Sequence, residues 1–537
     1  MNSTATTASR RRRTAAFRAL VAVVASLFWL SIGPRPVAAA EDYLSAALKL
    51  TEDFRANLEQ LAALCEQRGL SEQAAQTRGW VKPPDPTRLF VSVLPVEIGP
   101  PAPPEGASAD VAAWHKRFYE LRSEQAGDYY ALARKAVKAR HASLAFDLIM
   151  AALHEDPDHK SIRQMLGFRQ YRGQWLTNYE MKRAQEGYLW HERFGWIKRN
   201  LVGQYEEGKR PSDKGWITAE EDARLHADIR NGWVIQTEHY NILTNHSIEE
   251  GVALGAKLEG LYRVWKQLFI RYYASEAQVA GLFEGRAAKL QLPQHNVVHF
   301  RNRQEYVAAL SPGYPSIGIS LGIYISGPTP VPTPGPPPIS KKSAMYFFAG
   351  EDSDVPTLYH EATHQLFHES RQVSPMVGQG GNFWVIEGVA MYFETLKQEN
   401  GSHVLGGFDT ERVEVARIRL FEPKYRFYEP LAKFCELNIT DIQSDQDLIA
   451  KRYTQAAGLF FFLMHYDNGR YRDAAVAYLN AVYSARDTVK TLRQLARTTY
   501  EELDRQYAEF MKGPGETVES PAGAPAEPNA DNTNSLQ

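Results

Sequence analysis

The sequence predicts an α+β fold, in which an N-terminal α-helical, repeat-like region precedes a domain built from a small mixed sheet and several helices. Two observations predict it. Apolar residues recur every three or four positions in residues 41–69 and 111–168, which is the period of an amphipathic helix. From Trp233 onward, short β-branched and aromatic runs alternate with longer helical patterns, which indicates strands and helices in one domain.

Composition narrows the class of protein. The chain has 537 residues, of which 44% are hydrophobic, enough to form two or three domains. Its net charge of −2 argues against a nucleic-acid partner, because binding to a phosphate backbone needs clustered basic surface. With only Cys65 and Cys435 a disulfide framework is excluded, and whether these two residues pair stays open.

The N-terminus, residues 1–40, has the pattern of a secretory signal peptide. Arg10 to Arg13 form a positive segment, residues 19–32 form a short apolar segment, and Ala38 and Ala40 offer a cleavage site. A transmembrane anchor is the alternative, but the apolar run is shorter than the roughly 20 residues that cross a bilayer. We therefore expect cleavage near Ala40, export to the periplasm or the extracellular space, and no membrane span in the mature chain.

Residues 41–110 are expected to form a helix over 41–69, closed by Gly69, and then a proline-rich linker. The linker segments "VKPPDPTRLF" and "IGPPAPPEGAS" should be extended rather than packed.

Residues 111–230 are expected to be helical, with connectors at the end. Alanine-rich helices joined by "DPDH" resemble tetratricopeptide-type pairs, which implies a possible protein partner for the N-terminal helices. Two later segments, "GQWLTNYE" and "KGWITAEE", each place a threonine three residues before a glutamate, which is the capping box of a helix start. We interpret these two segments as structural connectors.

Residues 231–512 are expected to form the α+β domain, and residues 513–537 a disordered tail with too few apolar residues to pack. A proline run at 327–338 suggests a surface loop in polyproline conformation. The expected strands cover 233–244, 295–300, 322–326 and 344–348, and the main expected helices cover 247–273, 355–370 and 382–396.

The helix expected at 355–370 carries the most informative motif, "HEATH". Its spacing places His360 and His364 one turn apart on the same face, where two imidazoles can share one ion. A catalytic zinc ion takes three protein ligands and keeps one open position. Glu361 lies beside the pair and is suited to accept a proton from water at the metal.

Glu387 is a better candidate for the third ligand than His368. His368 lies roughly 12 Å along the helix axis from His360, too far for convergence on one ion. The apolar helix expected at 382–396 can pack on the first helix and present Glu387 to the histidine pair. A carboxylate that faces inward is costly without a partner, and a cation supplies one. The alternative is a glutamate on the exposed face of an amphipathic helix.

"HEATHQ" followed by "WVIEGVAMYFE" resembles the gluzincin zinc metallopeptidases, most closely the peptidase-MA-like domain of exported bacterial proteins, over roughly residues 233–512. The resemblance implies that His360, His364 and Glu387 bind Zn²⁺ and that Glu361 is the general base. It implies further that Tyr453 donates a hydrogen bond to the oxyanion. It also matches "GIYIS" to the edge strand that pairs with an extended substrate in such enzymes.

Two positions depart from the family pattern. Met391 occupies the place of the aspartate that orients a zinc-bound histidine in the thermolysin-like branch, and Glu394 is expected to serve instead. "SAMYFFAGE" lacks the stretch with which the aminopeptidase branch grips a substrate's amino terminus. The resemblance therefore implies an endopeptidase-like enzyme rather than an aminopeptidase.

The expected activity is hydrolysis of peptide bonds in a peptide or protein substrate, assisted by zinc. Replacement of Glu361 by Gln should keep the metal and abolish the chemistry, and Glu387→Ala should lose the metal. The alternative is a non-catalytic protein of the cell envelope in which zinc stabilises a scaffold. Retention of Glu361 favours catalysis, because a structural metal site does not require it.

Overall fold

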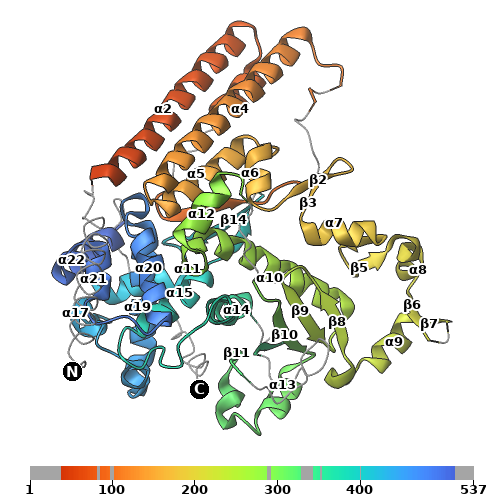
Figure 1. Cartoon of the computed structure of the whole chain (residues 1–537), viewed down its shortest axis with the longest axis vertical. Helices are drawn as coiled ribbons and strands as arrows, with labels where there is room; N and C mark the ends of the chain where they lie inside the picture. The colour runs from red at the N-terminus through yellow and green to blue at the C-terminus, as the bar shows by residue number, and fades with distance from the viewer. Residues whose placement is uncertain are drawn as a thin grey trace, which may run out of the picture.

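The computed structural model describes residues 38–80, 85–96, 102–103, 105–213, 215–286, 292–327, 343–350, 354–399 and 401–513. Most of the expected signal peptide, the proline run at 328–338 and the tail from 514 onward lie outside the described residues. The fold is α+β, as the sequence predicts (Figure 1). Within the described part of the chain, every helix is too short or too polar to cross a bilayer.

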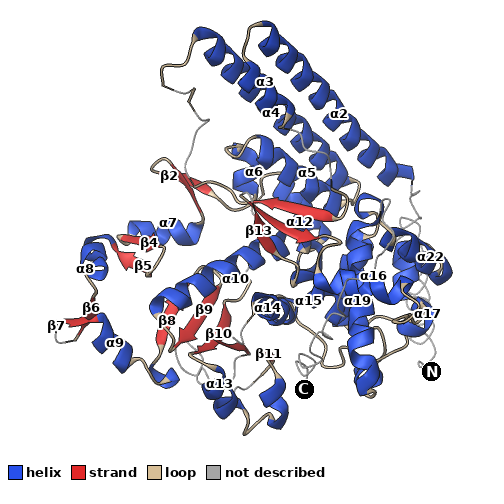
Figure 2. Ribbon diagram, turned by 180° about the vertical axis from the view of Figure 1, so that it is seen from behind, coloured by secondary structure: helices blue, strands red, loops and turns tan. Residues whose placement is uncertain are grey.

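The N-terminal region is a group of helices with one strand. Helices α2 and α4 lie side by side and project from the rest of the molecule, and α5 returns along α4 (Figures 1 and 2). A small core between α2, α3 and α4 contains Cys65, whereas Cys435 lies in the main core, and the two thiols are free. The elements are α2 (Ala38–Gln67), α3 (Ser71–Arg78), β1 (Arg88–Ser92), α4 (Ala109–Lys138), α5 (Ala142–Glu155) and α6 (Lys160–Met165).

The expectation that the proline-rich linker is unpacked is wrong for part of it. The segment "RLFVS" forms β1, which pairs antiparallel with β14 (Ser402–Gly406), and Leu89 and Val91 enter the main core. The physical reason is that alternate side chains of a strand share one face, so Leu89 and Val91 are buried together while Phe90 between them is exposed. The prolines flank the strand and do not interrupt it.

Residues 169–231 form an arm of three consecutive hairpin–helix units, visible at one side of the molecule (Figure 1). The sequence pattern indicated the helix starts of two of them but not their hairpins, and the structure adds a third unit at "FGWIK". In each unit a Gly-Trp or Gly-Gln-Trp segment opens the second strand of the hairpin. The sequence pattern does not mark the third unit, because no threonine caps its helix. The elements are β2 (Arg169–Tyr171), β3 (Gln174–Leu176), α7 (Asn178–Gln185), β4 (Tyr188–His191), β5 (Gly195–Lys198), η1 (Arg199–Leu201), α8 (Val202–Glu206), β6 (Lys209–Ser212), β7 (Gly215–Thr218), α9 (Ala219–Leu225) and η2 (Ile229–Asn231).

A five-stranded sheet follows, in the order β11-β12-β10-β9-β8, with β9, β10 and β12 parallel and both edge strands antiparallel. The single strand expected at 233–244 is two strands, because a turn at Thr237 to His239 reverses the chain. Helices α10 and α14 pack on one face, and α13 covers the other. The elements are β8 (Trp233–Gln236), β9 (Tyr240–Thr244), α10 (Ile248–Leu268), α11 (Ile270–Tyr273), α12 (Glu276–Phe283), β10 (His295–Phe300), α13 (Arg303–Leu310), η3 (Pro315–Ile319), β11 (Gly322–Ile325) and β12 (Ala344–Phe348).

The C-terminal part is mainly helical and completes the core. Helix α15 lies between α14 and α19, and its contact with α19 is close, because a Cβ at Gly388 would meet the backbone oxygen of Ala456 at 2.9 Å. The expected helices at 355–370 and 382–396 are α14 and α15, each slightly shorter. The elements are α14 (Val355–Glu369), α15 (Trp384–Phe393), β13 (Lys397–Glu399), β14, α16 (Glu411–Phe421), α17 (Leu431–Phe434), α18 (Ile439–Gln443), α19 (Gln446–Gly469), α20 (Arg472–Tyr483), α21 (Thr491–Ala496) and α22 (Tyr500–Met511).

Candidate metal centre

Helix α14 holds the two histidines of the motif on one face. Asp354 caps the helix through a hydrogen bond from the Thr357 backbone N–H, with a proline in the first turn, so the start of the helix is fixed by local chemistry. One turn apart, the His360 and His364 rings turn their Nε2 atoms toward each other at 3.1 Å. Two imidazole nitrogens at this distance cannot both carry a proton that points at the other, and with no proton between them both lone pairs can bind one metal ion.

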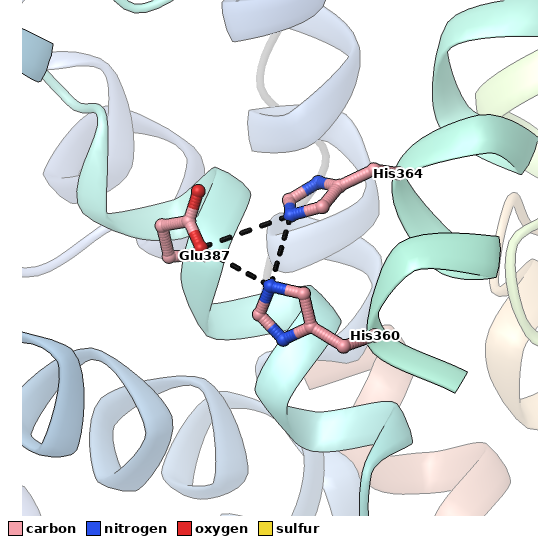
Figure 3. A group of neighbouring side chains, drawn as sticks. All are labelled: His360, His364 and Glu387. Carbon is pink, nitrogen blue, oxygen red and sulfur yellow. Dashed lines mark hydrogen bonds and ion pairs between the residues drawn. The ribbon is translucent and has the colours of Figure 1, made fainter. Parts of the chain in front are cut away.

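Glu387, in the first turn of α15, completes the group (Figure 3). Its Oε2 atom lies 3.4 Å from His360 Nε2 and 3.7 Å from His364 Nε2. The side chains of His360, His364 and Glu387 are 1%, 0% and 2% exposed. The structure therefore brings together the three residues that the sequence selected as ligands, in a buried group that could hold a metal ion.

The spacing of the three donor atoms fits a tetrahedral ion. Donors about 2.0–2.1 Å from a tetrahedral zinc ion are roughly 3.3 Å from one another. The three separations in the group are 3.1, 3.4 and 3.7 Å, which bracket that value. Glu387 Oε2 is buried and, apart from its contacts with the two histidines, accepts no hydrogen bond from the described residues, so this oxygen is available as a metal ligand. The chemistry of the donor set and its spacing both fit Zn²⁺.

Glu394 lies where the sequence argument placed it, behind the first histidine. Its Oε1 is 2.8 Å from His360 Nδ1, and Arg412 Nε donates to its Oε2 at 2.9 Å. The carboxylate fixes the ring with Nε2 toward the group. Burial opposes charge on the imidazole, but hydrogen bonds to Glu387 and Glu394 raise the pKa of His360 to about 10. Sequence reasoning missed Arg412, because no local pattern marks a residue of α16 as a partner of α15.

Glu361 is buried and forms a hydrogen bond to the sheet. Its Oε2 accepts a hydrogen bond from the backbone N–H of Tyr324 at 2.8 Å, and its Oε1 has no partner among the described residues. Tyr324 belongs to β11, the edge strand of the sheet, so this N–H points off the open edge. Burial raises the pKa of Glu361, against the charges of His360 and His364.

A close approach of β11 to α14 makes this contact possible. A Cβ at Gly322 would lie 3.1 Å from the Phe347 ring and 3.3 Å from Glu361 Cγ. A residue larger than glycine would therefore press on Glu361 itself. The sequence showed the edge strand but not this contact with the glutamate.

Tyr453 lies on α19, buried behind α15. Burial and the charge of Glu387 raise the pKa of its phenol well above the usual value, so the hydroxyl stays protonated. Tyr453 therefore lies close enough to Glu387 and Glu361 for the charge of each carboxylate to raise the pKa of its phenol. His368 is not part of the group, since its ring lies between those of Tyr324 and Tyr483, at centroid distances of 5.6 and 5.3 Å.

Comparison with known proteins adds one finding. Residues 354–487 match a family model described as "Protein of unknown function (DUF1570)". The match covers 134 of the 537 residues and runs from the cap of α14 to just beyond α20, so it contains His360, His364, Glu387, Glu394 and Tyr453. No curated protein and no solved structure matches the chain significantly.

Proposed function

We propose that the chain is a zinc metallopeptidase that hydrolyses internal peptide bonds. The observation that carries this proposal is the pairing of the buried group His360, His364 and Glu387 with a glutamate that such a metal site alone would not need. Glu361 is held by an edge strand, and its Oε1 has no hydrogen-bond partner in the part of the chain that the structure describes.

A bound zinc ion would polarise a substrate carbonyl and lower the pKa of water toward about 7. Glu361 Oε1 can take the proton from the attacking water and return it to the leaving amine. The Tyr453 phenol, which is protonated, can donate to the oxyanion, a role worth a few kcal/mol. The open edge of β11 can pair with an extended peptide backbone beside Glu361.

Zinc-loaded protein and the Glu361→Gln variant, incubated with a diverse peptide library, provide the test. Glutamine keeps an acceptor oxygen for the Tyr324 N–H and loses only the basic oxygen, so we expect equal zinc content in both proteins and cleavage by the native protein alone. Products from both proteins alike would refute Glu361 as the base. Products from neither, at full zinc content, would favour the second candidate.

The second candidate is a scaffold in which zinc ties α14 to α15 without catalysis. The observation that favours it is the near-complete burial of all three ligands. A structural site contributes its binding free energy to folding. The scaffold therefore predicts a large loss of thermal stability on zinc removal and no cleavage of any library peptide.

We also propose that the protein acts outside the cytoplasm. The support is the pattern of residues 1–40, with a basic segment, a short apolar segment and a cleavage site near Ala40. N-terminal sequencing of the protein recovered from its native host tests this proposal. A mature chain that begins near residue 41 is expected, and an intact N-terminus in the cytoplasmic fraction would refute export.

A further inference from the structure

A hollow of about 620 Å³ lies at the C-terminal end of α14, apart from the metal group. Three arginines and several polar side chains line it, and none of the lining residues that the structure describes carries a carboxylate. The lining comes from the ends of α11, α14 and α20. The residues are Arg271, Tyr272, Tyr273, Ala274, Ser275, Arg371, Gln372, Val373, Ser374, Pro375, Asn480, Ser484 and Arg486.

Two of the arginines are held in place by neutral acceptors. Arg371 donates from Nη1 to the Tyr272 carbonyl at 3.2 Å and from Nη2 to Ser484 Oγ at 2.8 Å, and its guanidinium lies over the Tyr272 ring. Arg271 donates from Nη1 to the Ala274 carbonyl at 2.9 Å. A guanidinium has five N–H donors, so each of these side chains keeps donors for a ligand.

The acidic residues that lie near the hollow in sequence are engaged elsewhere. Glu369 contacts His295 at 2.6 Å, Glu276 pairs with Arg140 at 2.9 Å, and Asp487 accepts from Asn382 at 2.6 Å. Among the described residues, no carboxylate forms an ion pair with any of the three arginines. Three like charges around one hollow repel one another, and an anion between them would remove that cost.

A simpler role accounts for two of the arginines but not for the third. The carbonyl ends of α11, α14 and α20 carry partial negative charge, and cations near such ends are stabilising. Arg271 and Arg371 bond backbone carbonyls in this way. Arg486 is exposed and makes no side-chain hydrogen bond within the described chain, so helix capping gives no reason for its place at the hollow.

We propose that this hollow is a binding site for a multiply charged oxyanion of the phosphate type. Three guanidiniums, the Ser374 hydroxyl and the amide of Asn480, which keeps one N–H beside its bond to the Tyr272 carbonyl, match an anion with several acceptor oxygens around one centre. Free inorganic phosphate and a phosphate monoester on a larger molecule share this chemistry. The site does not depend on the peptidase proposal, because none of its residues belongs to the metal group.

Calorimetric titration with inorganic phosphate, at constant ionic strength and in one metal state, tests the proposal. We expect saturable 1:1 binding by the native protein and at least about tenfold weaker binding by Arg486→Gln and by Arg371→Gln. Arg426→Gln is the matched control, because Arg426 is exposed, lies outside the hollow and changes the net charge equally. Phenyl phosphate, titrated in parallel, distinguishes the two sources: tighter binding than phosphate indicates a monoester ligand.

Two outcomes would overturn the site. One is no saturable phosphate binding by native protein whose circular dichroism spectrum shows it folded. The other is an equal loss in Arg426→Gln, which would mean attraction by overall charge rather than a built site. If Arg371→Gln fails to fold, Arg486→Gln decides, because an exposed side chain without bonds contributes little to stability.

Discussion

The two halves of α14 place histidines in opposite surroundings. In the first half His360 lies between the carboxylates of Glu387 and Glu394, which overcome burial and raise its pKa to about 10. Two turns later His368 lies between two tyrosine rings, and burial together with the charge of His364 lowers its pKa to about 4. The same helix therefore carries one histidine whose surroundings favour the charged ring and another whose surroundings favour the neutral ring.

The difference shows that the neighbouring helices, together with the spacing within α14, decide which histidine can hold a cation. Both carboxylates around His360 come from one short segment, residues 387–394 of α15 and its end. No acidic side chain reaches the ring of His368 in the described structure as an ion-pair partner. The variants below test this contrast, from the largest expected effect to the smallest.

Removal of the ligand carboxylate should have the largest effect. Glu387→Gln keeps the shape of the side chain but removes its charge from the buried group, so zinc affinity should fall by more than about 100-fold. Zinc content after dialysis against a competing chelator measures the change. Glu436→Gln, an exposed residue with the same change in charge, serves as the control and should retain its zinc. Full zinc occupancy in Glu387→Gln would show that the group does not bind the metal through this carboxylate.

Loss of the carboxylate behind His360 should have a smaller effect. Glu394→Gln can still accept a hydrogen bond from the ring but no longer pairs with Arg412, so zinc affinity should fall by about 10- to 100-fold. The same chelator competition measures this change. Arg412→Gln should move in the same direction by less, because the carboxylate remains. An unchanged affinity in both variants would mean that the ring is held by packing alone.

The residues in these two predictions also show which features of the site could be predicted from the sequence. Asp354, Pro356 and the three-to-four spacing are local signals, so α14 and α15 could be predicted from the sequence, whereas the inward-facing Glu387 and Glu394 are expected mainly from the family resemblance. The partners of those residues could not. Arg412 and the Tyr324 N–H reach the site from α16 and β11, and β1 pairs with a strand more than 300 residues later. Such contacts depend on how elements meet in space, and one sequence carries no periodic pattern for them.

A histidine in the sheet extends the contrast to protein stability. His299 on β10 is buried, lies 3.3 Å from Thr244 Oγ1, and has its pKa lowered to about 3 by burial and by the charges of His246 and Lys257. In the unfolded chain the His299 ring takes up a proton below about pH 6.5. In the folded protein the same ring stays neutral until about pH 3. The contribution of His299 to the free energy of unfolding is therefore present above about pH 6.5 and is lost as the pH falls below that value.

Urea unfolding at pH 7 and pH 5.5 measures this contribution. Because the His299 ring is protonated only in the unfolded chain at pH 5.5, it should lower the free energy of unfolding by about 1.4 kcal/mol at that pH. Between the two pH values His299→Gln should lose about 1.3 kcal/mol less than the native protein, because about 0.2 kcal/mol is already lost at pH 7 and the other buried histidines titrate in both proteins. Equal losses in both proteins would mean that His299 is accessible to protons in the folded state.

The smallest effect is expected at the histidine that the sequence argument excluded from the metal. His368→Gln should change zinc affinity by less than about threefold, because the ring lies two turns from His360 and contacts Tyr324 and Tyr483 instead. The chelator competition used for Glu387→Gln supplies the measurement. A loss comparable to that of Glu387→Gln would contradict the contrast between the two halves of α14, since it would make His368 a ligand despite its surroundings. An unchanged affinity together with a lower melting temperature would place its contribution in the packing between α14, β11 and α20.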